Sequence, residues 1–567
     1  MRVVLAIGAV VALACLIAAP SLWSAMRHAR AGRAALDAAT TSIKQTDVAS
    51  ARPFLATANA EFATASSRLD SIWVAPTRHV PVIGRQLAAA SALARAGELA
   101  SRAARVGVGA LDPLVLRISG GRIDLAALSR MREAAESALP DASHALSLLD
   151  ASPRSWVLPP LSHARSKAVA QVSSAVSTAE KGSAGLRAAP WLLGADAPRR
   201  YVVFFANPAE SRGTGGLWGL YTYVDASAGA IHIESQAGRP SVDLPDLRAA
   251  DLHPPQWYAD AWGSMGATSI WQNINLSPDF PTVAGLVVEA LHRSVDGVIQ
   301  VDPAGLGALL KITGPVSIAS WPEPIDASNV ERIAMHDVYE RWRTGAEEAE
   351  RTRFGAEMVR AVVGRVLSSN FSFRRADLSA LSAAGAGRHV QMYATDARAQ
   401  QALSVTGLSG GLDRPADSDV VGVFTNNAAG GKADWYLHRD VRVSARVGAR
   451  TAETTVTVLL RNDAPATGLP PYVTGTKYAA GENAVIVEVV RGPGDRLLGA
   501  WLDGRGVNVA TGAEGTLTAR RLLVSIRPGQ TVRLELRSEV PVGPAGYRVV
   551  ELPAPGAQPA TYQAGRG

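Results

Sequence analysis

An uncharged, strongly apolar stretch at the N-terminus constrains this chain more than any other feature. From Val3 to Met26 no residue carries a charge, and a helix needs about 20 apolar residues to cross a bilayer. The stretch therefore predicts a transmembrane anchor over residues 1–26. A cleaved signal peptide is the main alternative, although its apolar core is normally ~7–15 residues long and hydrophobicity here continues past Ala19 to Trp23.

Two properties of this segment stay open. The tetrapeptide ALAC that ends at Cys15 loosely resembles the cleavage box of a lipoprotein. Only Arg2 precedes the stretch, whereas Arg27, Arg30 and Arg33 follow it. By the positive-inside rule this bias places the bulk of the chain in the cytoplasm.

Composition limits the rest of the chain to several packed domains without disulfides. A chain of 567 residues with 47% hydrophobic and 19% charged residues is too long for one core and too apolar to be disordered. Its single cysteine excludes an intrachain disulfide framework, a cysteine-based zinc site and a paired-thiol redox motif. The formal charge of +7, from 57 basic and 50 acidic residues, is spread along the chain, so we expect no nucleic-acid partner.

Three segments with different residue patterns follow the anchor. Residues 27–190 are rich in alanine with apolar positions three and four apart, which predicts a helical bundle or stalk. Breaks divide it into about five helices; they fall at Pro53, Pro76, Pro81, Gly120-Gly121, Pro140 and 153–160.

Residues 191–433 predict an α/β layered core, because apolar strand segments alternate with helical ones. We expect strands at 201–207, 217–225, 230–235, 295–302 and 315–320, and helices at 281–294, 303–312, 328–345 and 351–369.

Residues 434–556 show a period of two without helical segments, which predicts an antiparallel β-sandwich. The chain is then expected to end in a disordered tail at 557–567, rich in Pro, Gly and Ala.

The common catalytic signatures are missing or out of context. Gly430-Gly431-Lys432 is followed by Ala433 rather than Ser or Thr, there is no H-E-x-x-H pair, and the ten histidines lack metal-ligand spacing. Residues 407–411 match G-x-S-x-G letter for letter, but Pro415 follows where a nucleophile elbow needs a helix.

Polar residues gather instead in three places. The first two are 207–216 and 273–281, where polar side chains lie among glycines and prolines at predicted strand ends. The third is the arginine-rich segment 341–353, which suits bidentate phosphate binding. The alternatives are a helix cap at Asp279 and a solvated helix whose arginines pair with Glu347, Glu348 and Glu350.

At these residues the chain resembles a bacterial membrane-anchored family, domain of unknown function 4012. The resemblance rests on NPAESRGTGG (207–216), NINLSPDFP (273–281), VDGVIQVDPAGLGALLKITGPV (295–316), TNNAAGGKADWYLHRDV (425–441) and NDAPATGLPPYV (462–473). Ser211-Arg212-Gly213 and Leu217-Trp218 depart from the family pattern.

A more distant resemblance suggests a mechanism. Residues 295–316 and 339–353 look like segments of the LytR-CpsA-Psr phosphotransferases, which move a glycan from a polyprenyl-pyrophosphate carrier to the cell wall outside the membrane. The resemblance implies a pyrophosphate clamp and a carboxylate that holds Mg²⁺ or accepts a proton. The implied substrate-binding residues are Arg212, Arg239, Arg341, Arg343 and Arg353, and the implied catalytic carboxylates are Glu210, Asp243 and Asp279. Gly314-Pro315-Val316 replaces the Gly-Gly-Val of those enzymes.

We therefore expect a multidomain α+β protein with an N-terminal transmembrane helix, an Ala-rich helical bundle, an α/β core similar to the LytR-CpsA-Psr fold and a C-terminal β-sandwich. Both resemblances place its bulk outside the cytoplasm, against the arginine bias, and imply a role in cell-envelope glycopolymer assembly as a phosphotransferase. Its partners would be the membrane, a polyprenyl-linked glycan and the cell wall. The alternative is a non-catalytic envelope module that binds glycan or a partner protein.

Overall fold

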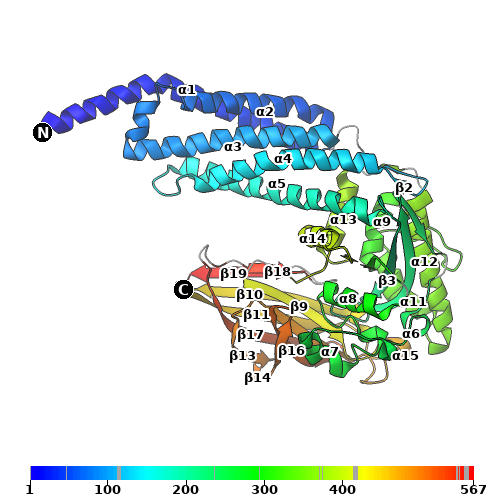
Figure 1. The fold of residues 1–567 in the computed structure, drawn as a ribbon. Helices are drawn as coiled ribbons and strands as arrows, with labels where there is room; N and C mark the ends of the chain where they lie inside the picture. Colours follow the sequence, from blue (N-terminus) through cyan, green and yellow to red (C-terminus); the bar gives the residue numbers. More distant parts are fainter. Residues whose placement is uncertain are drawn as a thin grey trace. The chain divides into compact units, whose positions relative to one another are not determined.

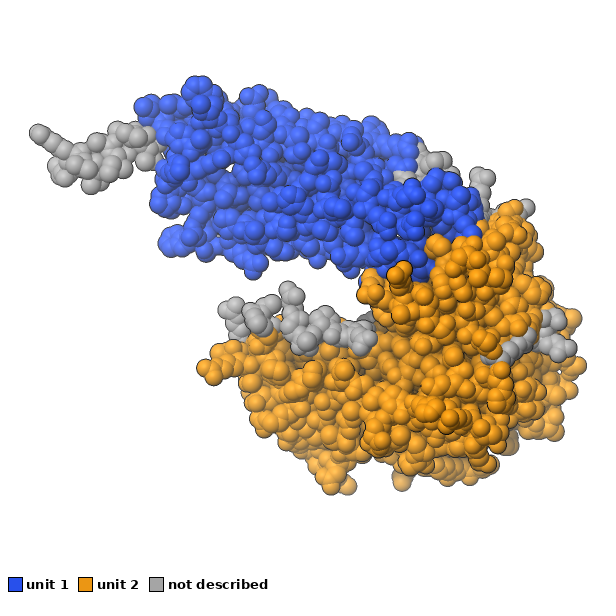
Figure 2. Space-filling model, in the orientation of Figure 1, with its two compact units in different colours: residues 1–117, 124–189 blue, residues 118–123, 190–567 orange. Residues whose placement is uncertain are grey.

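The computed structural model describes residues 2–45, 47–111, 117–234, 237–292, 294–368, 371–372, 375–412, 419–543, 547, 549–553 and 561–566. It divides into two compact units (Figure 2). The first holds residues 1–117 and 124–189, and the second holds 118–123 and 190–567.

The first unit is a bundle of long helices that run back and forth (Figure 1). They are α1 (Arg2–Lys44), α2 (Val48–Leu69), α3 (Pro81–Leu111), α4 (Leu125–Ala151) and α5 (Pro159–Leu192), with a 3₁₀ turn η1 (Ala75–His79) before α3. Small side chains fill the seams, among them Ala58, Ala65 and Ala145, which are fully buried. Alanine lets helices approach closely, which explains the composition of this segment.

Two of the predicted helix breaks are wrong. Pro53 lies inside α2 and Pro140 inside α4. A proline removes one backbone hydrogen bond, and packing holds both halves of α4 in place because Ala138 and Ala142 are buried against the neighbouring helices.

Among the described residues, no helix is long and apolar enough to span a membrane. The side chains of residues 1–12, the first half of the predicted anchor, lie outside those described.

The second unit begins with an eight-stranded sheet of order β7-β1-β2-β5-β4-β3-β6-β8. Its strands are β1 (Arg117–Ser119), β2 (Arg122–Ile123), β3 (Arg199–Asn207), β4 (Leu217–Ser227), β5 (Ala230–Ile233), β6 (Gly297–Val301), β7 (Phe371–Ser372) and β8 (Val390–Ala394). β3 and β6 are parallel, and β4 and β8 flank them in antiparallel pairs.

The hairpin of β1 and β2 lies inside the segment that the sequence predicts as helical. Gly120 and Gly121 both have positive φ, 57° and 74°, as a tight hairpin turn requires. Arg122 then pairs with Ala230 of β5.

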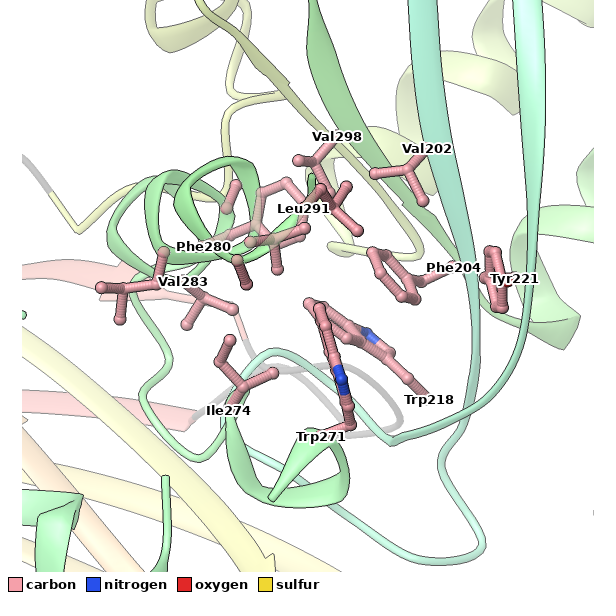
Figure 3. Close-up of a cluster of buried hydrophobic side chains, with 14 of the residues drawn as sticks. Val202, Phe204, Trp218, Tyr221, Trp271, Ile274, Phe280, Val283, Leu291 and Val298 are labelled. Atoms are coloured by element: carbon pink, nitrogen blue, oxygen red, sulfur yellow. The ribbon is translucent and has the colours of Figure 1, made fainter. Parts of the chain in front are cut away.

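Helices cover both faces of the sheet. On one face Val202, Phe204 and Trp218 pack against α8 (Phe280–Ala290), as Figure 3 shows, and also against α7 (Gln256–Trp262). Phe204 and Trp218 stack with ring centroids 4.1 Å apart. Phe205 points to the opposite face, where α9 (Pro303–Thr313) and α12 (Glu348–Ser368) lie. The alternation of neighbouring side chains along β3 thus builds two cores.

Shorter elements complete this region. They are α6 (Pro240–Asp243), η2 (Leu247–Ala249), η3 (Gly263–Met265), η4 (Trp271–Asn273), α10 (Val330–Arg332), a π-helical turn η5 (Ile333–Asp337), α11 (Val338–Arg341), η6 (Gly345–Glu347), α13 (Arg375–Ala386) and α14 (Ala397–Thr406). The strand expected at 315–320 is only an isolated bridge between Val316 and Ile325.

The C-terminal part is a sandwich of two sheets, with orders β14-β13-β17-β11-β10-β19 and β15-β16-β12-β9-β18. Its strands are β9 (Asp419–Asn427), β10 (Leu437–Val447), β11 (Thr451–Asn462), β12 (Asn483–Arg491), β13 (Arg496–Leu502), β14 (Arg505–Gly506), β15 (Ala510–Glu514), β16 (Leu517–Ile526), β17 (Thr531–Pro541), β18 (Val549–Leu552) and β19 (Thr561–Arg566), with η7 (Ala433–Tyr436) and α15 (Pro471–Thr474) in the connections. Side chains of both sheets share one core that contains Val423, Val458 and Val487.

Both ends of the sandwich differ from expectation. The sequence places β9 in the α/β core, but β9 pairs with β12 of the sandwich. Almost all of its side chains are buried. It therefore lacks the period of two by which the other sandwich strands are recognised. β19 lies in the segment predicted to be disordered and pairs in parallel with β10.

Candidate functional site

The loop between β3 and β4, residues 208–216, binds segments that are distant in the sequence. The backbone N–H of Gly213 donates to Oδ1 of Asn426, at 2.8 Å. Asn426 Nδ2 in turn donates to the carbonyl oxygen of Leu276, at 3.0 Å. Two of the three polar segments, 207–216 and 273–281, therefore meet through Asn426, which lies in the segment 425–441 of the family resemblance.

Glycine makes this close approach possible. A Cβ at Gly213 would lie 2.1 Å from the carbonyl oxygen of Leu276, and one at Gly216 would lie 2.4 Å from the carbonyl carbon of Asn207. These contacts are with backbone atoms, which cannot move aside like a flexible side chain. The glycines of the loop thus serve packing between backbones.

A buried ion cluster lies beneath the loop. Glu210 accepts from Nη2 of Arg212 at 3.0 Å and from Nζ of Lys432, and all three residues are buried. Arg212 also donates to the carbonyl oxygens of Gln272, at 2.8 Å, and Ser211, at 2.9 Å. Two of the predicted site residues are therefore in contact, and each already has partners from its own chain.

The cluster determines how Glu210 and Lys432 titrate. Burial opposes ionisation of Glu210, but the charges of Lys432 and Arg212 outweigh it and lower the pKa of the carboxyl. Burial likewise opposes the charged form of Lys432, while Glu210 outweighs it and raises the pKa of the amine. Both groups stay charged at neutral pH, and Glu210 is consequently a weak base.

Two tyrosines and an arginine lie next to this cluster. The ring of Tyr339 stacks on that of Tyr472, with centroids 5.8 Å apart, and the guanidinium carbon of Arg351 lies 3.9 Å from the centre of the Tyr472 ring. Arg351 donates to the carbonyl oxygens of Trp342 and Thr344, both at 2.7 Å. The buried Arg351 thereby fixes the backbone on both sides of the exposed Arg343.

Those exposed arginines pair mainly with nearby glutamates. Arg343 pairs with Glu340, and Arg353 lies 3.5 Å from Glu350, one turn away on α12. Such exposed pairs contribute little to stability. The Arg353–Glu350 pair matches the alternative of a solvated, ion-paired helix, whereas Arg343 pairs with Glu340, outside the three glutamates of that alternative.

Arg239 joins this surface from far away in the sequence. Its Nη1 lies 3.2 Å from Oε1 of Glu348, in the first turn of α12. Arg239 is therefore brought next to the segment with Arg341, Arg343 and Arg353, whereas Arg212 belongs to the buried ion cluster.

Arg341 differs from its neighbours because tryptophans hold it. Its guanidinium carbon lies 5.3 Å from the ring centre of Trp321 and 5.2 Å from that of Trp342. The side chain is exposed. Within the described part of the chain, no hydrogen bond or ion pair is found for it.

The two remaining carboxylates accept hydrogen bonds from backbone N–H groups. Asp243 accepts from the backbone N–H of Arg239 at 2.6 Å. Asp279 is the N-cap of α8 and accepts from the hydroxyl of Thr282 at 2.6 Å and from the N–H of Leu412 at 3.1 Å. Burial raises the pKa of Asp279. The capping alternative noted for Asp279 therefore holds.

No group of three or more His, Cys, Asp or Glu side chains that could hold a metal ion is present among the residues that the structure describes.

Residues 196–339, from β3 to the π-helical turn and Tyr339, match the model of a family described as "Protein of unknown function (DUF4012)". This stretch is a DUF4012 region. The family recognised from the sequence is thus confirmed over these residues, while the segments 425–441 and 462–473 lie outside the match. No curated protein and no solved structure matches the chain significantly, and the likeness to LytR-CpsA-Psr enzymes stays a prediction.

The DUF4012 region supplies Glu210, Arg212 and Tyr339 to the site, while Lys432 and Tyr472 come from beyond it. The sequence predicts no role for Lys432, which lies in an incomplete P-loop pattern and in the segment 425–441 of the family resemblance. The signal was present: Lys432 follows two glycines, and a Cβ at Gly431 would lie 2.3 Å from the carbonyl oxygen of Val473. Such packing brings the lysine backbone close to another chain segment.

Proposed function

We propose that the protein is a membrane-anchored, extracytoplasmic module of the cell envelope that binds glycan without performing chemistry on it. The observation that carries this proposal is the state of the three predicted carboxylates. Glu210 is neutralised by two buried cations, Asp243 accepts from the backbone N–H of Arg239, and Asp279 caps α8.

Phosphoryl transfer needs a group that takes a proton from the acceptor or holds Mg²⁺. A carboxylate with a lowered pKa, such as Glu210, accepts a proton poorly. Asp279 has a raised pKa, but its oxygens are occupied by Thr282 and Leu412. The arrangement favours a structural role for all three.

The binding surface in this proposal is centred on the exposed Arg341, whose guanidinium lies over the half-buried Trp342 and the buried Trp321. Aromatic and arginine side chains are enriched in recognition surfaces, and stacking on the two tryptophans already restricts the rotamers of Arg341 before a ligand binds. Arginine also forms forked hydrogen bonds with phosphate or carboxylate groups of a glycopolymer.

Membrane anchoring in this proposal rests on the uncharged stretch from Val3 to Met26, and the extracytoplasmic side rests on the family resemblance. A reporter fused after residue 40 tests the side. Activity confined to a reporter that works in the cytoplasm would refute the envelope assignment.

Binding is tested with the full chain in detergent and a purified cell-wall glycopolymer, by calorimetry. We expect saturable binding that Arg341→Ala weakens at least tenfold. Arg446→Ala is the matched control, because Arg446 is equally exposed but lies on β10. Equal binding by both variants would remove Arg341 from the proposal, and no binding by the unmodified chain would refute it.

A glycopolymer phosphotransferase is the second candidate. It is favoured by the position of Arg239 at the start of α12, beside the segment with Arg341 and Arg343. The full chain would then release polyprenyl phosphate from a lipid-linked glycan when Mg²⁺ and wall acceptor are added. Release that is lost in the Arg341→Ala, Arg343→Ala double variant would replace the first proposal with this one.

A further inference from the structure

One end of the helical bundle exposes large apolar side chains. They lie in the connection from α2 to α3, at the start of α3 and in the connection from α4 to α5: Ile72 (77% exposed), Trp73 (59%), Val82 (56%), Trp156 (77%) and Leu158 (59%). We call these five side chains the apolar tip. Isolated exposed hydrophobic residues are normal in proteins, but five on adjoining loops need an explanation.

The two loops are fastened to each other. Gln86 of α3 donates to the carbonyl oxygen of Trp156 at 2.7 Å and accepts from the N–H of Leu158 at 2.9 Å. Arg85 donates to the hydroxyl of Ser155 at 2.8 Å. The apolar tip is therefore one surface, at the end of the bundle where α2 turns into α3 and α4 into α5 (Figure 1).

Trp156 is held in an unfavourable backbone conformation. Its φ is 60°, in the left-handed region, which costs a residue other than glycine roughly 1–2 kcal/mol. A large apolar side chain that is strained and yet exposed gains nothing for the folded bundle. Strain of this kind is typical of functional positions.

The apolar tip lies where the N-terminal apolar stretch meets the bundle. Ala18 and Ala25 of α1 are buried in one cluster with Leu69, the last residue of α2, and Val74 from the α2–α3 connection. Of the uncharged stretch, Val3 to Ile17 precede this contact. As a helix they extend about 22 Å at 1.5 Å per residue, which is shorter than the roughly 30 Å hydrocarbon core.

Charge also favours a lipid surface. Residues 68–88 and 150–165 contain five arginines and no lysine, against two aspartates, Asp70 and Asp150. Arg27, just after the apolar stretch, lies over the ring of Trp23, with its guanidinium carbon 5.1 Å from the ring centre. Tryptophan beside arginine is the composition found at the interface between lipid and water.

We propose that the apolar tip inserts into the interfacial layer of the bilayer that holds the N-terminal helix. Insertion moves the end of the apolar stretch, Ala18 to Trp23, into the membrane and makes up the missing length. It also gives the bundle a second point of attachment, which restricts its tilt. This inference rests on the membrane anchoring in the proposed function.

The test uses the full chain with one fluorophore per molecule, which is simple because Cys15 is the only cysteine. The unmodified chain reports on the anchor. The Cys15→Ser, Leu158→Cys variant reports on the apolar tip. The Cys15→Ser, Ser177→Cys variant is the control, since Ser177 is exposed on α5 about 27 Å further along the helix. Each is reconstituted in vesicles of phosphatidylcholine and phosphatidylglycerol, with brominated acyl chains as the lipid quencher and iodide as the aqueous quencher.

We expect brominated lipid to quench the label at position 158 and iodide to quench it several-fold less than the label at position 177. Replacing Trp73 and Trp156 with serine should reduce the lipid quenching at position 158. Equal iodide quenching at positions 158 and 177, while lipid quenches the label on Cys15, would overturn the apolar-tip proposal and leave the anchor intact. Protection of position 158 from iodide without lipid quenching would also overturn it, because a protein would then cover the tip. Lipid quenching at position 158 but not at Cys15 would refute the anchor alone.

Discussion

The ion cluster of Glu210, Arg212 and Lys432 offers the most direct test of how the site is built. The substitution Lys432→Met removes one cation and keeps the shape of the side chain. Glu210 then has a single cationic partner, Arg212, at 3.0 Å. Removing one partner of a buried ion pair costs ~3–5 kcal/mol, and we expect about 3 kcal/mol because Arg212 remains.

The free energy of unfolding is measured by urea titration followed by tryptophan fluorescence, with the full chain in detergent. Lys311→Met is the matched control, since Lys311 is exposed in the last turn of α9; we expect a change below about 0.5 kcal/mol. The double variant Glu210→Gln, Lys432→Met leaves the buried Arg212 without its carboxylate partner, so we expect it to be less stable than the unmodified chain. Its loss should nevertheless be at least about 1 kcal/mol smaller than the sum of the two single-variant losses, because each single variant already breaks the Glu210–Lys432 pair.

The loss should also depend on pH. The pKa of Glu210 is lowered in the folded chain, so the stability it contributes is present above its unfolded value of about 4.3 and is lost as the pH falls through the folded value. In Lys432→Met, burial is less opposed and the pKa of Glu210 rises. The difference in free energy of unfolding between the unmodified chain and Lys432→Met should therefore be largest at neutral pH and smaller in acid.

Three outcomes would refute this reasoning. The first is a cost below about 1 kcal/mol for Lys432→Met, which would mean that the pair is not desolvated. The second is a gap that stays constant between neutral and acidic pH. The third is a double variant as unstable as the sum of the single variants, since additivity would show that the two side chains do not interact.

Three further predictions concern other parts of the fold. Gly213→Ala should lower the free energy of unfolding by about 3 kcal/mol, because its Cβ would lie 2.1 Å from a carbonyl oxygen. Gly219→Ala is the control and should cause no such loss, because a Cβ there would have nothing within 4 Å. A comparable loss in both variants would contradict the packing argument. Glu514→Gln should raise the melting temperature at pH 8 and flatten its decline above pH 5. Burial and the neighbouring Glu488 raise the pKa of Glu514, so the folded state favours the protonated carboxyl. The stability of the unmodified chain therefore falls as the pH rises above the pKa that Glu514 has in the unfolded chain. A wild-type melting temperature that rises over this range would refute it. Trp156→Gly should be more stable than Trp156→Ala by about 1 kcal/mol in detergent, because φ is positive at this position; equal thermal stability of the two variants would show that the position is not strained.

Much of the architecture could be predicted from local sequence patterns. β3, β4 and β5 appear near their expected positions, as do α8, α9 and α12. The helices have the spacing of an apolar face, and β3 is a continuous apolar run, so both signals are visible in the sequence. The predictions failed for β1 and β2, which are three and two residues long, and for the domain of β9, which is buried along nearly its whole length.

The candidate site was only partly predictable. Polar residues among glycines correctly marked segments that meet, since Gly213 contacts Asn426 across more than 200 residues. Their roles could not be predicted, because a carboxylate such as Glu210 can serve as a base, a metal ligand or one half of an ion pair. The choice depends on which cation lies beside it.

By itself, the sequence determined most element types, the DUF4012 family, which the family model confirms over residues 196–339, and the apolar character of the N-terminus. Only the tertiary structure decided that Lys432 neutralises Glu210, that Asp279 is a cap and that Trp156 is exposed. The physical reason is the distance along the chain over which each interaction acts. Helix and strand propensities act between neighbours a few residues apart, whereas burial and charge pairing depend on segments that only the folded chain brings together.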